Sequence, residues 1–285
     1  MGSLKQSRTA SYVILILIYI FAAVAGLAVY HALSFSWWKN LLIADVAATV
    51  LTFLFSVGLG NASVYDPYWS VQPIVILAAF AAGKELTPVR VMLLAAVILW
   101  GVRLTANWAY TFGDLTHQDW RYTMLQEKTG SLYPVVNFTG IHLVPTLVVY
   151  ACTLPAAYAF LHDGSWNAGS ILFFCISLGA AAMQGIADYQ MHRYQKHRTE
   201  PFIHEGLWKY SRHPNYLGEI LMWWGVALSV ISVFPKMWYL AFGAVANTLL
   251  FLLVSIPLAD GRQSAKPDFQ KYKNQTRMLL PIKKN

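Results

Sequence analysis

The chain has 285 residues, of which 57% are apolar and 12% are charged. An ordinary soluble domain carries about 25% charged residues, so this composition excludes a soluble globular protein and indicates that lipid surrounds most of the chain. The formal net charge is +8, but the basic residues do not gather in one domain, which excludes the usual pattern of a nucleic-acid-binding protein.

Eight apolar runs follow one another along the chain, most of them close to the roughly 20 residues that cross a bilayer. They cover residues 12–34, 39–58, 69–83, 88–110, 139–161, 168–189, 216–234 and 237–258. The third run is short enough to be re-entrant. Because the runs recur along the whole length, a secreted protein with a cleaved signal peptide is excluded. The sequence therefore predicts an all-α, polytopic transmembrane helical bundle with about 7–8 spans, in which residues 1–285 form a single membrane domain.

The basic residues are distributed unevenly between the two sides of this predicted bundle. When the N-terminus is placed in the cytosol, sixteen of the 21 Lys and Arg residues fall in inner segments and four in outer segments, while Arg103 lies within the fourth span. The positive-inside rule therefore predicts a multi-pass protein with both termini cytosolic. A bacterial inner membrane and an endoplasmic reticulum membrane fit this pattern equally.

Ionisable residues within predicted spans are candidates for function because they are costly in lipid. The candidates are Asp45, Arg103, Asp188 and Glu219. Asp45 has no polar neighbours on its own helix, so we expect it to join helices. Arg103 needs either a carboxylate or a ligand phosphate as its partner. Gln184, Asp188 and His192 recur every four residues and share one helix face, which either joins helices or binds a ligand.

The densest polar segment precedes and opens the seventh span. It contains Arg193 and the order Arg212-His213-Pro214-Asn215-Tyr216-x-Gly218-Glu219. A basic cytosolic loop does not require this order of residues. Pro214 suits the first turn of a helix, where free backbone N–H groups favour an anion. Asn215 and Glu219 lie one turn apart and can hydrogen-bond an amide or a ribose, while Arg193 and Arg212 can pair with phosphates.

These residues together predict a nucleotide pocket. The chain has no G-x-G-x-x-G motif after a strand and no P-loop, so helices and loops at the cytosolic face must hold the nucleotide. Its two cysteines, Cys152 and Cys175, lack the spacing of metal ligands, and no metal site is expected.

The segment from Asp188 to Trp224 resembles the conserved core of the steroid 5α-reductase superfamily, and most closely its domain-of-unknown-function 1295 branch. Similar segments elsewhere are Trp100-Gly101-x-Arg103-Leu104, Asp119-Trp120-Arg121-Tyr122, Ser255-Ile256-Pro257-Leu258, Phe269-x-x-Tyr272-x-x-x-Thr276 and Leu280-Pro281. The resemblance covers roughly residues 60 to 282. It implies a bundle of seven or eight helices that binds NADPH from the cytosol and reduces a carbon–carbon double bond conjugated to a carbonyl.

The resemblance also implies a division of the chain and a set of cofactor-binding residues. Residues 12–110 are expected on the substrate side, and residues 180–282 in the cofactor-binding part. The residues expected to bind the dinucleotide are Asp188, Arg193, Arg212, His213, Asn215, Tyr216 and Glu219, with Arg103 and Tyr272 in support.

The resemblance is less complete at the residues that polarise the substrate carbonyl. Steroid reductases polarise the carbonyl with a Gln-Glu pair and a Tyr on early helices, while the nicotinamide delivers hydride to the β-carbon. Here Tyr65-Asp66-Pro67-Tyr68 occupies the comparable stretch, and Trp100 stands near the position of the Tyr. We expect Tyr68 or Tyr65 to donate to the carbonyl and Asp66 to orient the donor. The implied partners are membrane lipids and a lipid or steroid-like substrate, and no nucleic acid or protein partner is indicated.

Two other functions compete with this interpretation. Isoprenylcysteine carboxyl methyltransferases share an Arg-His-Pro-x-Tyr-x-Gly-like element and a Glu on the same helix, but they use S-adenosylmethionine, which has no phosphate. The arginines near the motif, Arg193, Arg198 and Arg212 with Arg103, exceed what that cofactor needs. The third candidate is a non-catalytic lipid-binding membrane protein, which the missing Gln-Glu pair favours.

Overall fold

The structure, a computed structural model, describes residues 2–282, and within this range the chain is helical and contains no β-strand. The α-helices are α1 (Gly2–Lys5), α2 (Arg8–Ala32), α3 (Trp37–Leu59), α4 (Tyr68–Ala81), α5 (Pro88–Thr111), α6 (Trp120–Thr129), α7 (Tyr133–Val136), α8 (Val144–Leu161), α9 (Ala168–Lys196), α10 (Pro214–Val233), α11 (Phe242–Leu250), α12 (Ile256–Gln263) and α13 (Phe269–Gln275). Two π-helical segments, Asn137–Leu143 and Phe251–Ser255, precede α8 and α12.

Seven helical stretches among the described residues are long and apolar enough to cross a membrane. They are Arg8–Ala32, Trp37–Leu59, Pro88–Thr111, Trp120–Leu161, Ala168–Lys196, Pro214–Val233 and Pro235–Gln263. The predicted all-α polytopic bundle is thereby confirmed. The third predicted run corresponds to α4, which has 14 residues with Pro73 inside it and is not among the seven.

Several helices extend beyond the apolar runs that predicted them. α9 continues to Lys196, seven residues past the predicted end at residue 189, so His192 and Arg193 are helical. The segment between the fourth and fifth predicted runs contains α6, whose N-terminus is capped by the Asp119 side chain. Hydropathy marks contact with lipid, whereas a helix ends where its backbone groups are capped or a breaking residue occurs. Polar turns can therefore continue an apolar helix.

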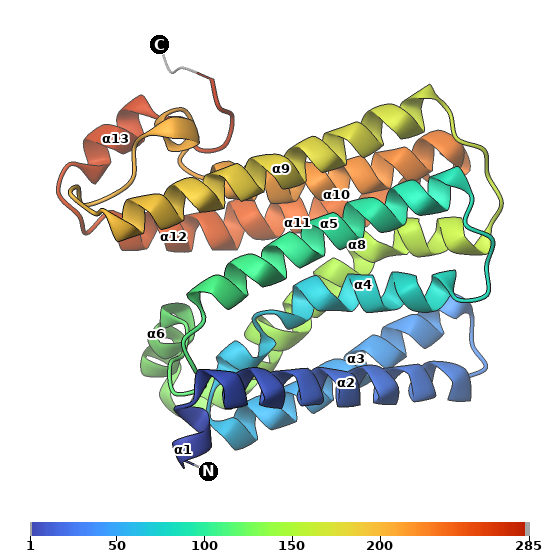
Figure 1. Ribbon diagram of the computed structural model, residues 1–285, viewed down its shortest axis with the longest axis horizontal. Coiled ribbons are helices and arrows are strands. Elements are labelled where there is room, and N and C mark those ends of the chain that lie inside the picture. The colour runs from blue at the N-terminus through green and yellow to red at the C-terminus, as the bar shows by residue number, and fades with distance from the viewer. Residues whose placement is uncertain (1, 283–285) are drawn as a thin grey trace. The chain divides into compact units, whose positions relative to one another are not determined.

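The chain divides into two compact units, unit 1 (Met1–Ala79 and Leu104–Leu154) and unit 2 (Phe80–Arg103 and Pro155–Asn285). In unit 1, α2 and α3 run side by side (Figure 1), and a Cβ added to Gly26 would lie 3.3 Å from the carbonyl oxygen of Ala44. The boundaries between the units fall within α4, α5 and α8. The division into a substrate side and a cofactor-binding part stays a prediction.

In unit 2, α9 and α10 run side by side (Figure 1), and small residues set their separation. A Cβ added to Gly218 would lie 2.8 Å from the carbonyl oxygen of Ala180, and one added to Gly225 would lie 2.7 Å from that of Phe173. Both distances are too short for any residue but glycine. This close approach brings polar side chains of α9 within hydrogen-bonding reach of α10.

Candidate functional site

Glu219 is the centre of a buried polar network in unit 2. Its side chain lies on the second turn of α10, and the residue is 3% exposed. Its Oε2 accepts hydrogen bonds from Trp100 Nε1 at 2.8 Å and Gln184 Nε2 at 2.7 Å, while Oε1 accepts from Trp223 Nε1 at 3.0 Å. Because three donors compensate the carboxylate, its burial is tolerated. The network joins α5, α9 and α10.

Arg103 extends this network toward the polar end of α9. Its Nη1 lies 2.6 Å from Asp188 Oδ2, and its Nη2 donates to Gln184 Oε1 at 2.7 Å. The predicted common face of Gln184 and Asp188 is thus confirmed, and the carboxylate partner that Arg103 requires is Asp188. The Arg103 Nε is buried and has no hydrogen-bond partner among residues 2–282. One donor of this guanidinium is therefore available to a ligand.

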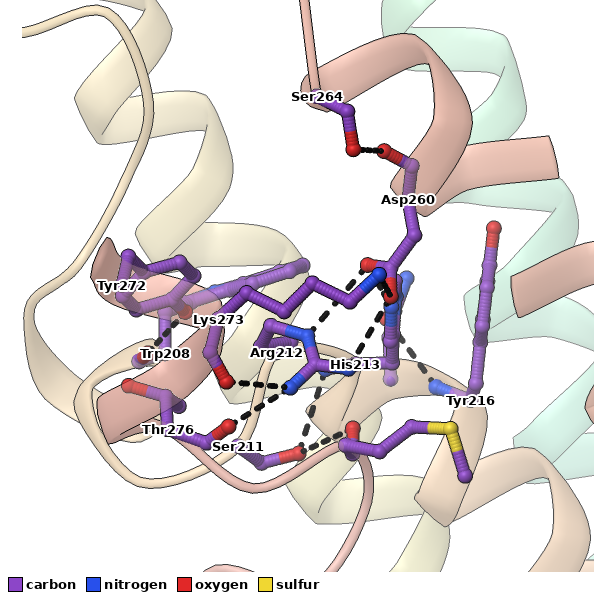
Figure 2. Close-up of polar contacts among 12 residues, drawn as sticks. Trp208, Ser211, Arg212, His213, Tyr216, Asp260, Ser264, Tyr272, Lys273 and Thr276 are labelled. Atoms are coloured by element: carbon purple, nitrogen blue, oxygen red, sulfur yellow. Dashed lines mark hydrogen bonds and ion pairs between the residues drawn. The ribbon is translucent and has the colours of Figure 1, made fainter. Parts of the chain in front are cut away.

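A second polar group in unit 2, which we call the Asp260 clamp, comprises Asp260, Arg212, His213 and Lys273. Figure 2 shows the three basic side chains converging on the carboxylate. Arg212 Nη2 lies 3.1 Å from Asp260 Oδ2, His213 Nε2 lies 3.0 Å from Oδ1, and Lys273 Nζ lies 3.7 Å from Oδ2. The side chains of Arg212 and Asp260 are 8% and 9% exposed, so this ion pair is buried.

Further hydrogen bonds fasten the C-terminal segment to the loop before α10. Arg212 Nη1 donates to the carbonyl oxygen of Thr276 at 2.7 Å, and its backbone N–H donates to that of Arg277 at 2.9 Å. Tyr272 donates its hydroxyl proton to the carbonyl oxygen of Trp208. Burial raises the pKa of Tyr272, so its hydroxyl stays protonated and able to donate. The predicted residues Arg212 and His213 therefore belong to the Asp260 clamp, and Tyr272 bonds the loop next to it.

The remaining predicted cofactor residues lie near these two groups. The Tyr216 ring stacks on the His213 ring with centroids 5.2 Å apart. Asn215 is partly exposed, and its side-chain oxygen accepts from the backbone N–H of Tyr216 at 3.1 Å. Pro214 occupies the first turn of α10, as predicted. Arg193 is exposed in the last turn of α9.

A half-open cleft of about 840 Å³ lies between the loop after α9 and α13. Its lining includes Phe202, Lys209, Tyr272 and Thr276. Its floor therefore adjoins the Asp260 clamp, and its position at a polar helix end suits a ligand that enters from water. The sequence analysis did not identify this cleft because its walls come from segments about 60 residues apart.

In unit 1, Tyr65 and Tyr68 lie together with their ring centroids 5.3 Å apart. The Tyr65 hydroxyl lies 2.8 Å from Thr146 Oγ1, and the Tyr68 hydroxyl donates to Asp45 Oδ1 at 3.3 Å. Asp45 also accepts from Gln72 of α4. The expected role of Asp45 in joining helices is therefore confirmed, and Asp45 is the carboxylate that contacts a predicted tyrosine donor.

Asp66 has a different partner from the one the sequence suggested. It accepts a hydrogen bond of 2.5 Å from the Tyr122 hydroxyl, so it orients the tyrosine of the Asp119-Trp120-Arg121-Tyr122 segment. Burial raises the pKa of Asp66 to about 6. The loop between α5 and α6 is held by Asn61, whose side-chain amide donates to the carbonyl oxygen of Leu115 at 2.8 Å. The two segments of the resemblance in unit 1 thus contact each other.

Several residues of these groups were absent from the predicted site. Asp260 had a recognisable signal, because it is one of only two acidic residues among residues 259–285 and follows directly after the last apolar run. Gln184 was recognised as part of a polar face but not as the residue that links Arg103 to Glu219. Thr146 and His142 gave no signal, since a single Thr or His in an apolar run is common in helix packing.

Comparison with known proteins places this chain in a family. The model of the family described as "Protein of unknown function (DUF1295)" matches residues 52–276. An uncharacterized protein of Schizosaccharomyces pombe is 28% identical in an alignment 213 residues long, and the match covers 65% of this chain and 61% of the relative. The match thus covers less than two thirds of that relative's length. No solved structure matches the chain significantly. The chain belongs to the DUF1295 family, which is part of the steroid 5α-reductase-like superfamily.

Proposed function

We propose that this protein is an integral membrane, NADPH-dependent reductase of a carbon–carbon double bond conjugated to a carbonyl, acting on a lipid or steroid-like substrate. The superfamily of the chain includes reductases. The observation that carries the proposal is the buried Arg103 guanidinium, which retains an unpartnered Nε–H among the described residues. A buried donor of this kind is costly unless a ligand accepts its hydrogen bond.

The basic residues of unit 2 support a phosphorylated ligand. Burial and the nearby charges of Arg198 and Arg262 lower the pKa of Lys266. Like charges held close together favour a bound anion, because its binding relieves their repulsion. Arg212 is committed to Asp260 and two carbonyl oxygens. In this proposal the phosphates therefore bind to Arg198 and Lys266, with Arg193.

Of the other predicted cofactor residues, Asn215 and Arg103 keep the role of hydrogen-bonding the dinucleotide, because Asp188, His213, Glu219 and Tyr272 are bonded to protein partners. Asn215 retains its amide for a ribose or carboxamide, and Arg103 offers Nε. The cofactor, when bound, supplies the hydride. In unit 1 the proposal assigns Tyr65 and Tyr68 to the polar end of the substrate. Burial raises the pKa of the Tyr65 phenol, so its hydroxyl stays protonated and is the donor, whereas the Tyr68 hydroxyl already donates to Asp45.

The proposal also includes the topology and the membrane. Both termini face the cytosol, so the basic segments of unit 2 have access to the cytosolic NADPH pool. The membrane is a bacterial inner membrane or the endoplasmic reticulum, and the remaining partners are lipids. A reporter fused to either terminus that is active only on the far side of the membrane would contradict this topology.

The cofactor is tested by thermal stabilisation of the purified protein in nanodiscs. We expect NADPH to raise the melting temperature more than NADH, because only NADPH carries a 2′-phosphate. A ligand at 100 times its Kd stabilises the folded state by about 2.7 kcal/mol. Arg198→Ala should weaken NADPH binding, whereas Lys236→Ala, in the 3-10 segment Pro235–Ala241 that follows α10, should not. Equal stabilisation by NADPH and NADH would contradict the preference for the 2′-phosphate.

One observation keeps the methyltransferase as a second candidate. Two of the four arginines that favoured a phosphorylated cofactor, Arg103 and Arg212, form internal ion pairs with Asp188 and Asp260. The positive charge available to a cofactor is therefore smaller than the sequence indicated. Stabilisation by S-adenosylmethionine without stabilisation by NADPH would establish this alternative, and a response to neither would favour the non-catalytic lipid-binding protein.

A further inference from the structure

One face of α3 carries a row of buried polar residues through the interior of unit 1. Asp45, Thr49, Thr52 and Ser56 are spaced by four, three and four residues, which places them on the same side of the helix. Each is at most 5% exposed. In a lipid environment such a row is stable only where other polar groups meet it.

Other elements of unit 1 supply some of those groups. Thr146 Oγ1 lies 3.0 Å from Thr49 Oγ1 and 2.8 Å from the Tyr65 hydroxyl. Gln72 uses its side-chain N–H₂ to donate to Asp45. These contacts satisfy Asp45 and Thr49, the first two members of the row.

His142 lies beside this row and has one ring nitrogen without a partner. It belongs to the π-helical segment Asn137–Leu143 and is 0% exposed. Its ring packs against the Tyr65 ring at 4.8 Å and against the Phe53 ring at 5.3 Å, so its position is fixed. Its Nε2 has no hydrogen-bond partner among residues 2–282.

The hydrogen bond at the other ring nitrogen determines what His142 can bind. Nδ1 lies 3.0 Å from the carbonyl oxygen of Asn137, which can only accept. Nδ1 must therefore carry the proton. A buried imidazole that contacts no carboxylate is neutral, so its Nε2 presents a lone pair. His142 offers an acceptor, and a ligand must bring the donor.

Three further buried atoms of unit 1 can also accept a hydrogen bond and have no partner among the described residues. Gln72 Oε1 is left without a partner because the amide nitrogen faces Asp45, and Asn137 Oδ1 and Ser56 Oγ also lack partners within the described range. All three residues are at most 5% exposed. The two amide oxygens only accept hydrogen bonds, and the serine hydroxyl can accept as well.

We propose that unit 1 binds an apolar lipid through a hydroxyl group, which donates a hydrogen bond to His142 Nε2. Buried acceptors without donors are costly, and a lipid alcohol supplies the missing donor while its hydrocarbon part occupies apolar surroundings. A ketone or an aldehyde brings only an acceptor and leaves Nε2 unsatisfied. This site goes beyond the reductase proposal, since the carbonyl of an enone cannot fill it.

The test compares ligands that share one skeleton and differ in a single group. Purified protein in nanodiscs is titrated with cholestan-3β-ol, cholestan-3-one and cholestane, and then with hexadecan-1-ol, hexadecanal and hexadecane, without nicotinamide cofactor. We expect the alcohol to bind about five- to tenfold more tightly than the ketone or aldehyde in at least one series, the effect of one net hydrogen bond. Because no cofactor is present, failure of the reductase proposal leaves this result unaffected.

A variant identifies the acceptor. His142→Phe keeps an aromatic ring beside Tyr65 but has no ring nitrogen, so the preference for the alcohol should disappear. The matched control is His117→Phe, since the His117 side chain is in unit 1 and is 80% exposed. Equal binding of alcohol, ketone and hydrocarbon by the unmodified protein would overturn the proposal and assign the acceptors to buried water. If His142→Phe does not fold, the two ligand series decide alone.

Discussion

The Asp260 clamp of unit 2 and the buried polar residues of unit 1 that include His142 differ in how fully their polar atoms are hydrogen-bonded. Both oxygens of Asp260 contact basic side chains, and Arg212 also donates to carbonyl oxygens. His142 has only one ring nitrogen bonded, and the acceptors of Gln72, Asn137 and Ser56 in the same unit lack donors among residues 2–282. A satisfied group stabilises the fold, whereas an unsatisfied one indicates where a ligand belongs. The comparison predicts that stability depends on unit 2 clamp residues and that lipid binding depends on unit 1.

The largest expected effect is on the clamp. Asp260→Ala leaves Arg212, whose side chain is 8% exposed, as an uncompensated buried charge. We expect a loss of about 3–5 kcal/mol of unfolding free energy, seen as the largest drop in melting temperature among the variants. The control is Glu205→Ala, which removes an exposed carboxylate of the same unit. Equal melting temperatures for the two variants would remove the distinction between the clamp and an exposed carboxylate.

The next effect concerns the close approach of α9 and α10. A Cβ at Gly218 would lie 2.4 Å from Gln184 Cγ as well as near the backbone of Ala180. Gly218→Ala should therefore push the helices apart and cost about 1–3 kcal/mol. Gly179→Ala on α9 meets nothing within 4 Å and should be neutral or slightly stabilising. Thermal unfolding of both variants measures the difference. A neutral Gly218→Ala would show that the Gln184–Glu219 contact does not need this separation.

A smaller effect is the dependence of stability on pH that the buried carboxyl group of Asp66 in unit 1 causes. Asp66 in unit 1 has a pKa raised to about 6 by burial. The folded state then holds the proton more tightly than the unfolded state, so stability is highest below about pH 4 and falls as pH rises through 6. We expect a loss on the order of 1–3 kcal/mol between pH 4 and pH 7. Asp66→Asn should flatten the curve of melting temperature against pH, whereas Asp163→Asn should leave its slope unchanged. An unaltered slope in Asp66→Asn would assign the dependence to another group.

The smallest expected effect on stability is at Asn215. Its side chain is partly exposed and hydrogen-bonds the neighbouring N–H of Tyr216. Asn215→Ala should change the unfolding free energy by about 0.5 kcal/mol or less while weakening NADPH binding about tenfold. Apo stability and NADPH affinity are measured on the same preparation. Reduced stability with unchanged affinity would move Asn215 from the cofactor site to helix packing.

The parts of this molecule that sequence predicted well depend on local spacing. The apolar runs located the spans, the four-residue spacing placed Gln184 and Asp188 on one face, and Pro214 marked the start of α10. These features follow from helix geometry within a few residues.

The parts that sequence did not predict depend on contacts between distant segments. Arg212 and Asp260 are 48 residues apart, and Tyr122 reaches Asp66 across 56 residues. No spacing rule identifies which carboxylate a distant side chain will contact. The π-helical turn that brings Nδ1 of His142 to the carbonyl oxygen of Asn137 likewise results from packing rather than from a recognisable motif.

Whether the short helix α4 crosses the membrane decides if the two ends of the chain lie on the same side. Its 14 residues form about 21 Å of helix, whereas the hydrocarbon core of a bilayer is about 30 Å thick. An even number of crossings returns a chain to the side where it began, and an odd number does not. The seven longer stretches alone make the number odd, so two cytosolic termini require that α4 also crosses. A short helix crosses where the bilayer is locally thinned or where flanking residues extend to the interface. Mapping the termini therefore also shows whether the bilayer or the flanking residues must adapt to α4.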